Sequence, residues 1–177
     1  KVERPRTGDD YRYGPSKKGE LSLSFQNNNR GKQSITLDVR TERGRELLLQ
    51  LVDGADALVE NFRAGWMAKQ GLGPDVIQAR NPRCVVASLS GFGHTGPQAG
   101  SASYDIVAQA MGGLMYTCGQ EGGPPTWLGV ALGDLYSAAL SVQGILFALF
   151  ERTRTGKGQY IDISMYDAII SLAERSI

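Results

Sequence analysis

Histidine and cysteine are scarce in this chain, and their scarcity excludes several kinds of site. The single histidine, His94, rules out metal sites with two or more histidine ligands, and a Ser-His-Asp triad would have to use that one residue. The two cysteines, Cys84 and Cys118, are too far apart for a metal-binding spacing, and they do not suggest a disulfide framework. We therefore expect no bound metal and a reducing, cytoplasmic environment.

An excess of either charge is also lacking. The 177 residues include 19 Lys and Arg against 18 Asp and Glu, which gives a formal net charge of +1. Proteins that bind nucleic acids or anionic membranes nonspecifically are usually strongly basic, so we expect neither partner. No secretory leader opens the chain, and the apolar stretch over residues 138–150 is shorter than a membrane span, which favours a buried helix.

Glycine, by contrast, is abundant. Its 23 residues make up about 13 % of the chain, against a usual ~7 %. They follow no period and are not accompanied by serine runs, so they indicate neither a linker nor a collagen-like repeat. Glycines between apolar segments are typical of tight turns in α/β enzymes, and the length suits one domain of that class.

Hydrophobic periodicity predicts strands that alternate with helices, which favours a parallel sheet. Residues 1–20 are interpreted as an irregular lead-in, and residues 27–32 as a polar turn. Strands are expected at residues 21–25, 34–39, 57–60, 84–89 and 160–163. Helices are expected at residues 41–54, 64–70, 74–80, 104–116, 132–152 and 164–175, with Thr41 and Ser164 as caps and Gly112 and Gly113 as a weak point.

One motif is misleading. Gly91, Gly93 and Gly96 form the G-x-G-x-x-G pattern of a dinucleotide site directly after a predicted strand. In a dinucleotide fold the third glycine already belongs to a helix, whereas here Pro97 follows and residues 98–101 favour a loop. We therefore interpret the segment as a loop at the carboxyl edge of the sheet, and His94 as a loop residue rather than a catalytic base.

Asp134 has two possible roles at the start of the long helix predicted from residue 132. An aspartate in this position commonly caps the free N–H groups of the first turn, where the helix dipole also favours negative charge. The same environment would keep the carboxylate ionised, and an ionised carboxylate beside a glycine-flanked approach is able to attack an activated acyl group. The local sequence alone does not choose between a cap and a nucleophile.

Several stretches together resemble one known family, the class III CoA-transferases, which include formyl-CoA transferase, carnitine CoA-transferase and α-methylacyl-CoA racemase. Eight ordered motifs over essentially the whole chain carry the resemblance. They are Lys1-Val2-Glu3-Arg4-Pro5, residues 29–35 (NRGKQSI), residues 59–65 (VENFRAG), residues 71–73 (GLG), residues 90–97 (SGFGHTGP), residues 104–109 (YDIVAQ), Gly133-Asp134, and residues 154–159 (RTGKGQ).

The resemblance implies a Rossmann-like fold, in which a parallel sheet is flanked by helices, within the large domain of an interlocked homodimer. It also implies that residues 1–177 are one partial large domain, without the family's N-terminal strand and C-terminal half; the absence of an initiator Met agrees with this. The implied reaction is transfer of coenzyme A between an acyl-CoA and a small carboxylic acid through an aspartyl-CoA thioester. No permanently bound cofactor is implied, because coenzyme A and acyl-CoA are substrates.

The resemblance also assigns candidate site residues. Asp134 would be the catalytic nucleophile. The positions that would contact coenzyme A are Arg4, Leu37, Asp38, Val39, Arg40, Asn61, Phe62, Arg63, Lys69, Ser101, Ala102, Ser103 and Tyr104. Cationic side chains in this set suit phosphates, and Phe62 offers an apolar wall for adenine or pantetheine.

One departure favours transferases over racemases. Racemases of the family have a histidine directly before the aspartate that corresponds to Asp105, where this chain has Tyr104. Without that second acid or base, exchange of an α-proton lacks a partner. An acyl-CoA racemase or epimerase and a non-catalytic CoA-binding module are the alternatives, and formate or oxalate, carnitine derivatives and C4–C5 dicarboxylates all stay open as substrates.

Overall fold

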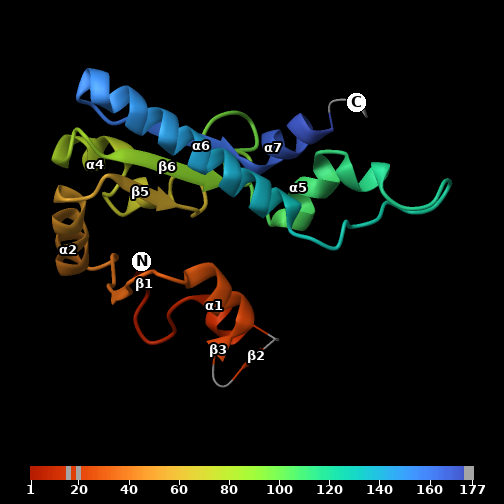
Figure 1. Ribbon diagram of the computed structural model, residues 1–177, viewed down its shortest axis with the longest axis horizontal. Coiled ribbons are helices and arrows are strands. Elements are labelled where there is room, and N and C mark those ends of the chain that lie inside the picture. Colours follow the sequence, from red (N-terminus) through yellow and green to blue (C-terminus); the bar gives the residue numbers. More distant parts are fainter. Residues whose placement is uncertain (15–16, 19–20, 174–177) are drawn as a thin grey trace. The chain divides into compact units, whose positions relative to one another are not determined.

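The computed structural model describes residues 1–14, 17–18 and 21–173, and these divide into two compact units, Lys1–Leu51 and Val52–Ile177 (Figure 1). The first unit contains two pairs of short strands. Strand β1 (Val2–Glu3) pairs in parallel with β4 (Ile35–Thr36), and β2 (Lys17–Lys18) pairs antiparallel with β3 (Leu21–Ser22). A 3-10 helix η1 (Asp10–Tyr13) and helices α1 (Leu23–Asn29) and α2 (Glu42–Asp53) complete it.

A buried carboxylate holds the first unit together. Glu3 accepts hydrogen bonds from Arg12 Nε at 2.8 Å and Nη2 at 2.9 Å, from Ser34 Oγ at 2.7 Å and from the main-chain N–H of Asp9 at 3.0 Å. These bonds, that of Arg12 above all, lower the pKa of Glu3 from 4.5 to about 2 although its burial acts in the opposite direction. The carboxylate therefore ties β1 to η1 and to the residue before β4.

Local predictions for the first unit are partly wrong. The expected strand over residues 21–25 ends at Ser22, whose hydroxyl accepts the N–H of Phe25 at 3.0 Å and so begins helix α1. This helix also takes up residues 27–29 of the expected turn. The lead-in expected over residues 1–20 contains β1, η1 and β2, and its residues 15, 16, 19 and 20 lie outside the described part. The Thr41 cap is confirmed, because its Oγ1 accepts the N–H of Gly44 at 3.0 Å.

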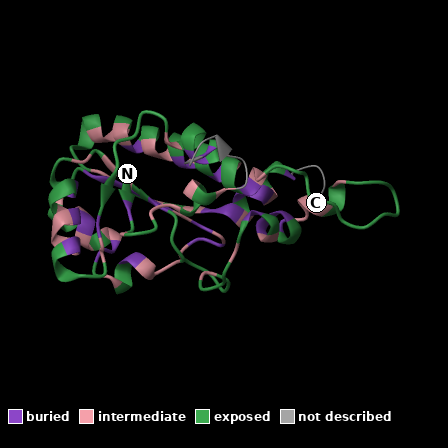
Figure 2. Cartoon of the chain, turned by 90° about the horizontal axis from the view of Figure 1, so that it is seen from below, coloured by how far each residue is buried: buried purple, intermediate pink, exposed green. Residues whose placement is uncertain are grey.

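The second unit is built on a parallel sheet, as predicted. Its strands lie in the order β5 (Ala57–Glu60), β6 (Val85–Ser90) and β7 (Tyr160–Ser164). The central strand β6 is almost wholly buried, which explains its continuous apolar sequence (Figure 2). The helices are α3 (Trp66–Lys69), α4 (Pro74–Arg80), α5 (Asp105–Met111), the 3-10 helix η2 (Leu114–Thr117), α6 (Leu132–Thr155) and α7 (Met165–Leu172).

Most local predictions for this unit are confirmed. The bounds of β5 and α4 are those expected, and Ser164 caps α7 by accepting the N–H of Asp167 at 3.1 Å. The helix expected over residues 104–116 is interrupted at the glycine pair, as the weak point predicted, so that α5 and η2 are separate. The last helix ends at Leu172, and residues 174 and 175 of the expected helix lie outside the described part.

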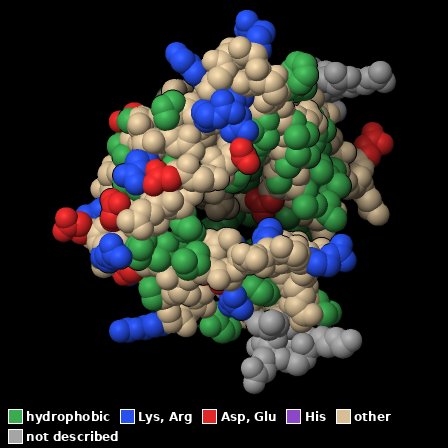
Figure 3. Space-filling model, turned by 60° about the vertical axis from the view of Figure 1, so that its left-hand side comes forward, with side chains coloured by type: hydrophobic (Ala, Val, Ile, Leu, Met, Phe, Trp, Pro, Cys, Tyr) green, Lys and Arg blue, Asp and Glu red, His purple; other side chains and the backbone are tan. Residues whose placement is uncertain are grey.

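Helix α6 runs along the sheet and contacts β6, β7 and α7 (Figure 1). It ends where Gly156 adopts a left-handed φ of 72°, a conformation that suits glycine. The prediction that its apolar stretch is buried is wrong for this chain, because only Gly133, Ser137, Ser141 and Ala148 are buried in it. Its exposed apolar residues are Leu135, Val142, Leu146, Phe147 and Phe150, and Figure 3 shows how hydrophobic side chains gather in a broad patch on the surface.

The length and composition of α6 would allow it to cross a membrane. Core helices of soluble proteins often share both properties, so they do not decide where this helix lies. Its first turns, together with α5 and α7, enclose a small apolar cluster of Ala108, Met165 and Ile169, with Leu89 and Leu132 against it. This cluster lies beyond the carboxyl end of β6 and supports the start of α6, where Asp134 is located.

Candidate functional site

Asp134 lies in the first turn of α6, on a side of the helix that is exposed. The N-cap position belongs to Ala131, which provides no side-chain hydrogen bond. Within the described part of the chain, no hydrogen bond or ion pair is assigned to the Asp134 carboxylate. The interpretation of Asp134 as the helix cap is therefore wrong, and its carboxylate is not committed to holding the fold together.

A second carboxylate, Asp105 at the start of α5, performs the capping. Its Oδ1 accepts the main-chain N–H of Gly133 at 2.7 Å, and its Oδ2 accepts Gln109 Nε2 at 2.8 Å and Trp127 Nε1 at 3.2 Å. The residue is buried, and so is Gln109, whose amide also donates to the carbonyl of Val130 at 2.9 Å. Asp105 thus fixes the segment before α6 and the residue adjacent to Asp134.

Sequence reasoning did not identify Asp105, Gln109 and Trp127 as site residues. A partial signal was present, because Asp105 and Gln109 are four residues apart and so share one face of a helix. A long exposed loop of residues 119–130 projects from the rest of the second unit (Figure 2). Asp105 bonds to Trp127 within this loop and to Gly133 just after it. No local pattern predicts a contact across such a loop.

Asp105 acts electrostatically on Asp134. The pKa of Asp134 is raised above its ordinary value of 3.8, first because partial burial disfavours the charged form and then because Asp105 is negatively charged. This corrects the expectation that the helix start would favour ionisation of Asp134. A carboxylate with a raised pKa is more basic and more nucleophilic than an ordinary one when it is ionised.

The glycine motif is a loop, as predicted, because residues 91–104 contain no helix. Gly91 lies directly against Ser103: a Cβ built on Gly91 would be 2.2 Å from Ser103 Cβ, so no larger residue fits there. The loop is held at the other side by the N–H of Tyr166, which donates to the carbonyl of Gly91 at 3.0 Å. The Ser101–Tyr104 stretch predicted to contact coenzyme A therefore packs on the glycine loop and leads into Asp105.

The predicted contact segment Asn61-Phe62-Arg63 follows β5. The ring of Phe62 is half exposed and lies 4.2 Å from the ring of Trp66, measured between centroids, which makes an accessible aromatic surface. Trp66 was not among the predicted site residues. Lys69 lies at the end of α3, and within the described residues neither Lys69 nor Arg63 is assigned an ion pair.

The remaining predicted contacts belong to the first unit. Arg4 and Leu37 follow the paired strands β1 and β4, and the N–H of Leu37 donates to the carbonyl of Glu3 at 3.0 Å. Leu37 is buried in the core of this unit. The cationic side chains there already have partners, because Arg4 pairs with Asp10 and Arg40 pairs with Asp38 at 2.9 Å.

Within the second unit, three contacts connect the segments in which the predicted residues Asn61–Arg63, Ser101–Tyr104 and Asp134 lie. The segment after β5 contacts the glycine loop through Glu60 and His94, which are 3.8 Å apart. The loop contacts Ser103, and Asp105 connects that stretch to the start of α6 and Asp134. These contacts all lie beyond the carboxyl ends of parallel strands, where ligands of open α/β sheets bind.

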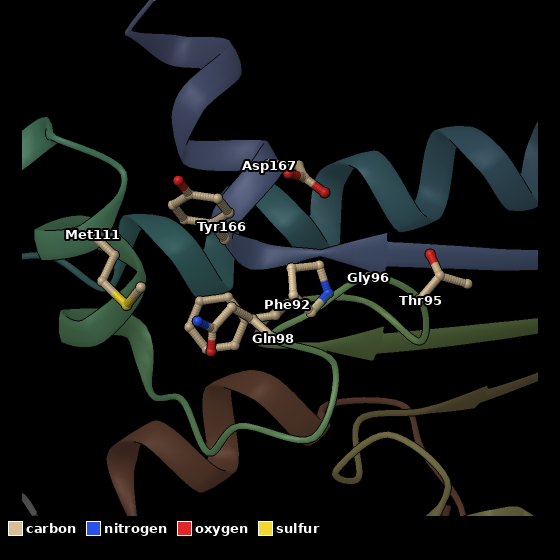
Figure 4. Close-up of a pocket in the computed structure, with 8 residues that line it drawn as sticks. Phe92, Thr95, Gly96, Gln98, Met111, Tyr166 and Asp167 are labelled. Carbon is tan, nitrogen blue, oxygen red and sulfur yellow. The ribbon is translucent and has the colours of Figure 1, made fainter.

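A cavity of about 400 Å³ lies beside these contacts, between the glycine loop and the start of α7 (Figure 4). It is lined by Phe92, Thr95, Gly96, Pro97, Gln98, Met111, Tyr166 and Asp167. Asp134 is not among the lining residues. Among the residues described, no group of three or more His, Cys, Asp or Glu has the arrangement of a metal site.

Comparison with known proteins identifies the family. The profile of CoA-transferase family III matches residues 1–177. The chain is 46 % identical over its whole length to succinyl-CoA:mesaconate CoA-transferase of Haloarcula hispanica and 44 % identical to acetyl-CoA:oxalate CoA-transferase of Acetobacter aceti, and it covers 47 % and 46 % of these proteins. The crystal structure of a CAIB/BAIF family protein from Brucella suis superposes with a TM-score of 0.91 at 44 % identity, over 97 % of this chain and 47 % of that protein.

The chain thus spans about half the length of the curated relatives it matches. The match is nevertheless continuous from its first residue to its last. On the combined strength of the profile, the identity and the shared fold, this chain belongs to CoA-transferase family III.

Proposed function

We propose that the protein carrying this chain transfers coenzyme A from an acyl-CoA to a carboxylic acid, with Asp134 as the nucleophile. One observation carries the proposal: Asp105 caps helix α6, and Asp134 in the first turn of that helix has no structural partner assigned among the described residues. A carboxylate whose pKa is raised and that is not occupied by a structural bond is a candidate functional group. Membership of the family supports the same reaction.

The chemistry balances without a metal or ATP. The Asp134 carboxylate attacks the thioester carbonyl, the C–S bond breaks, and a mixed anhydride and CoA thiolate form. The thiolate attacks the aspartyl carbonyl of the anhydride and releases the donor carboxylate, which leaves an aspartyl-CoA thioester. The acceptor carboxylate attacks this thioester and expels the thiolate, which then attacks the acceptor's acyl carbonyl and regenerates Asp134. One thioester is consumed and one is made.

Binding of the donor is assigned to the predicted contact residues. Arg63 and Lys69 are available for phosphate groups, because no carboxylate is paired with either within the described ranges. Arg4 and Arg40 would first have to exchange Asp10 and Asp38 for phosphate. The Phe62 and Trp66 rings offer a stacking surface for adenine or an apolar wall for pantetheine.

We take the first substrates to test from the relatives. Succinyl-CoA is the donor named for the Haloarcula hispanica protein, and mesaconate and oxalate are acceptors named for the two relatives. Small dicarboxylates suit a site whose partners are cationic and main-chain groups. An acceptor screen with succinyl-CoA therefore begins with these acids.

The decisive experiment traps the intermediate. After succinyl-CoA is added, hydroxylamine should convert Asp134, and only that residue, to a hydroxamate that mass spectrometry locates. The Asp134→Ala variant should lose exchange by at least ~10³-fold, as is usual when a covalent nucleophile is removed. Asp75→Asn is the matched control, since Asp75 is also an exposed acid in the first turn of a helix. Full exchange activity in Asp134→Ala would refute the proposal, and α-deuterium incorporation without an acceptor would indicate a racemase.

We further propose that the protein works as a homodimer. The exposed apolar side chains of α6, among them Phe147 and Phe150 at 73 % and 77 % exposure, support an additional covering surface. Light scattering coupled to size exclusion should give twice the chain mass. A monomer at micromolar concentration would contradict this proposal. The cytoplasmic location stays a prediction.

A further inference from the structure

His94 and Glu60 form a partly buried, incompletely bonded pair at the carboxyl edge of the sheet. The Nε2 atom of His94 is buried without a hydrogen-bond partner among the described residues, and it lies 3.8 Å from Glu60 Oε1. This distance is too long for a hydrogen bond. Because Nε2 itself is buried, solvent does not compensate for its missing partner, and the Glu60 side chain is only 6 % exposed.

Each member of the pair is anchored to a different segment of the site. Glu60 Oε2 accepts the main-chain N–H of Phe62 at 2.7 Å and so orients the Asn61-Phe62-Arg63 segment. The main-chain N–H of His94 donates to Asp162 Oδ2 at 2.8 Å, which fixes the glycine loop to the edge of β7. A bond between Glu60 and His94 would connect the two segments directly.

We propose that Glu60 and His94 are positioning residues, and that protonation of His94 closes the gap to Glu60 and holds the Asn61-Phe62-Arg63 segment ready for coenzyme A. A protonated imidazole donates from both ring nitrogens, and its bond to a carboxylate shortens to about 2.8 Å. Closure therefore needs a movement of only about 1 Å. The inference rests on the proposed function, because it assigns coenzyme A to the segment after β5.

The other groups that face His94 do not account for such a response. The ring of Tyr160 on β7 contacts the imidazole edge-on at 6.1 Å between centroids. Burial raises the pKa of the Tyr160 hydroxyl above its ordinary value of 10.0, so it stays neutral where histidine changes charge, between about pH 5 and 8. Asp162 is occupied by the main-chain N–H of His94, which does not titrate.

The pair predicts tighter coenzyme A binding at acid pH. Calorimetry of free coenzyme A is best done on the Asp134→Ala background, which removes turnover and the titration of that carboxylate. We expect Kd to increase by about 3- to 10-fold from about pH 5.5 to 8. This change corresponds to a part of the binding affinity that one charge-assisted hydrogen bond contributes. His94→Gln and Glu60→Gln should each abolish this dependence, and the double variant should behave like either single one.

Two further measurements distinguish the possible results. Tyr160→Phe keeps the ring beside His94 and should keep the pH dependence. In ¹⁵N spectra of the imidazole at acid pH, Glu60→Gln should change the signal of Nε2, because the charge-assisted bond to the carboxylate is lost. A Kd that depends on pH equally in His94→Gln overturns the inference and leaves the proposed function intact. If coenzyme A does not bind at any pH, both fail; if Asp134→Ala still catalyses exchange, only the proposed nucleophile fails.

Discussion

Replacement of Asp105 provides the sharpest test of how the fold supports Asp134. Asparagine is nearly isosteric, and its oxygen retains the bond to the N–H of Gly133. Its amide group, however, would face the N–H donors of Gln109 and Trp127, which both now donate to Oδ2. Because these donors are buried or partly buried, we expect Asp105→Asn to lower the free energy of unfolding by about 1–3 kcal/mol.

Alanine at the same position should cost more. It removes all three bonds, leaves the buried N–H of Gly133 unsatisfied and deletes the cap of α6, so we expect a loss of about 2–5 kcal/mol. Urea unfolding followed by circular dichroism measures both variants. We expect the alanine variant to be the least stable, the asparagine variant to be intermediate and the wild type to be the most stable, because this is the order of the number of bonds that each keeps. Equal stability of all three would refute the assignment of Asp105 as the cap.

The same asparagine variant tests the electrostatic argument. Asp105 raises the pKa of Asp134, and the proposed nucleophile acts in its ionised form, so activity should fall as the pH decreases through that pKa. Without the negative charge at residue 105, the acidic limb of kcat should move to lower pH. The readout is kcat for CoA exchange between about pH 4 and 8, the range in which carboxylates with raised pKa values titrate. A kcat that falls uniformly, with the acidic limb unmoved, would mean that Asp105 acts only on the position of Asp134.

Three further predictions concern other parts of the chain. The pKa of Glu3 is lowered from 4.5 to about 2, so the ionised carboxylate stabilises the fold above that range, and this stabilisation is lost as the pH falls. At about 1.4 kcal/mol per pH unit, the free energy of unfolding of the wild type should fall by about 3 kcal/mol between about pH 5 and 2 in urea titrations. The free energy of unfolding of Glu3→Gln should fall much less over the same range. Gly91→Ala should force its methyl group against Ser103, lower the stability by about 1–3 kcal/mol and raise KM for acyl-CoA, whereas Gly100→Ala, with open space around it, should change neither. Cys84 is fully buried and burial raises the pKa of its thiol, so it should react with Ellman's reagent only after unfolding; fast reaction in the native protein would contradict this.

The sequence alone predicted those elements whose signals are local. The bounds of β5 and α4 follow from a β-branched run and from a proline in the first helical position, and the Thr41 and Ser164 caps act within one turn of their helices. The prediction of a strand over residues 21–25 was wrong. The apolar segment suits either a strand or a helix, and the hydroxyl of Ser22, which accepts the N–H of Phe25 three residues later, favours the helix.

The tertiary structure decided which residues of the candidate site bond to one another. Residue type placed a carboxylate at residue 134, but the local sequence did not choose between a cap and a nucleophile. The helix start is capped by Asp105, 28 residues before its partner Gly133, and the pairing of His94 with Glu60 likewise joins residues 34 apart. Such contacts depend on how strands and helices pack and not on any periodicity along the chain, because hydrogen bonds form between atoms that are close in space, whatever their separation in sequence.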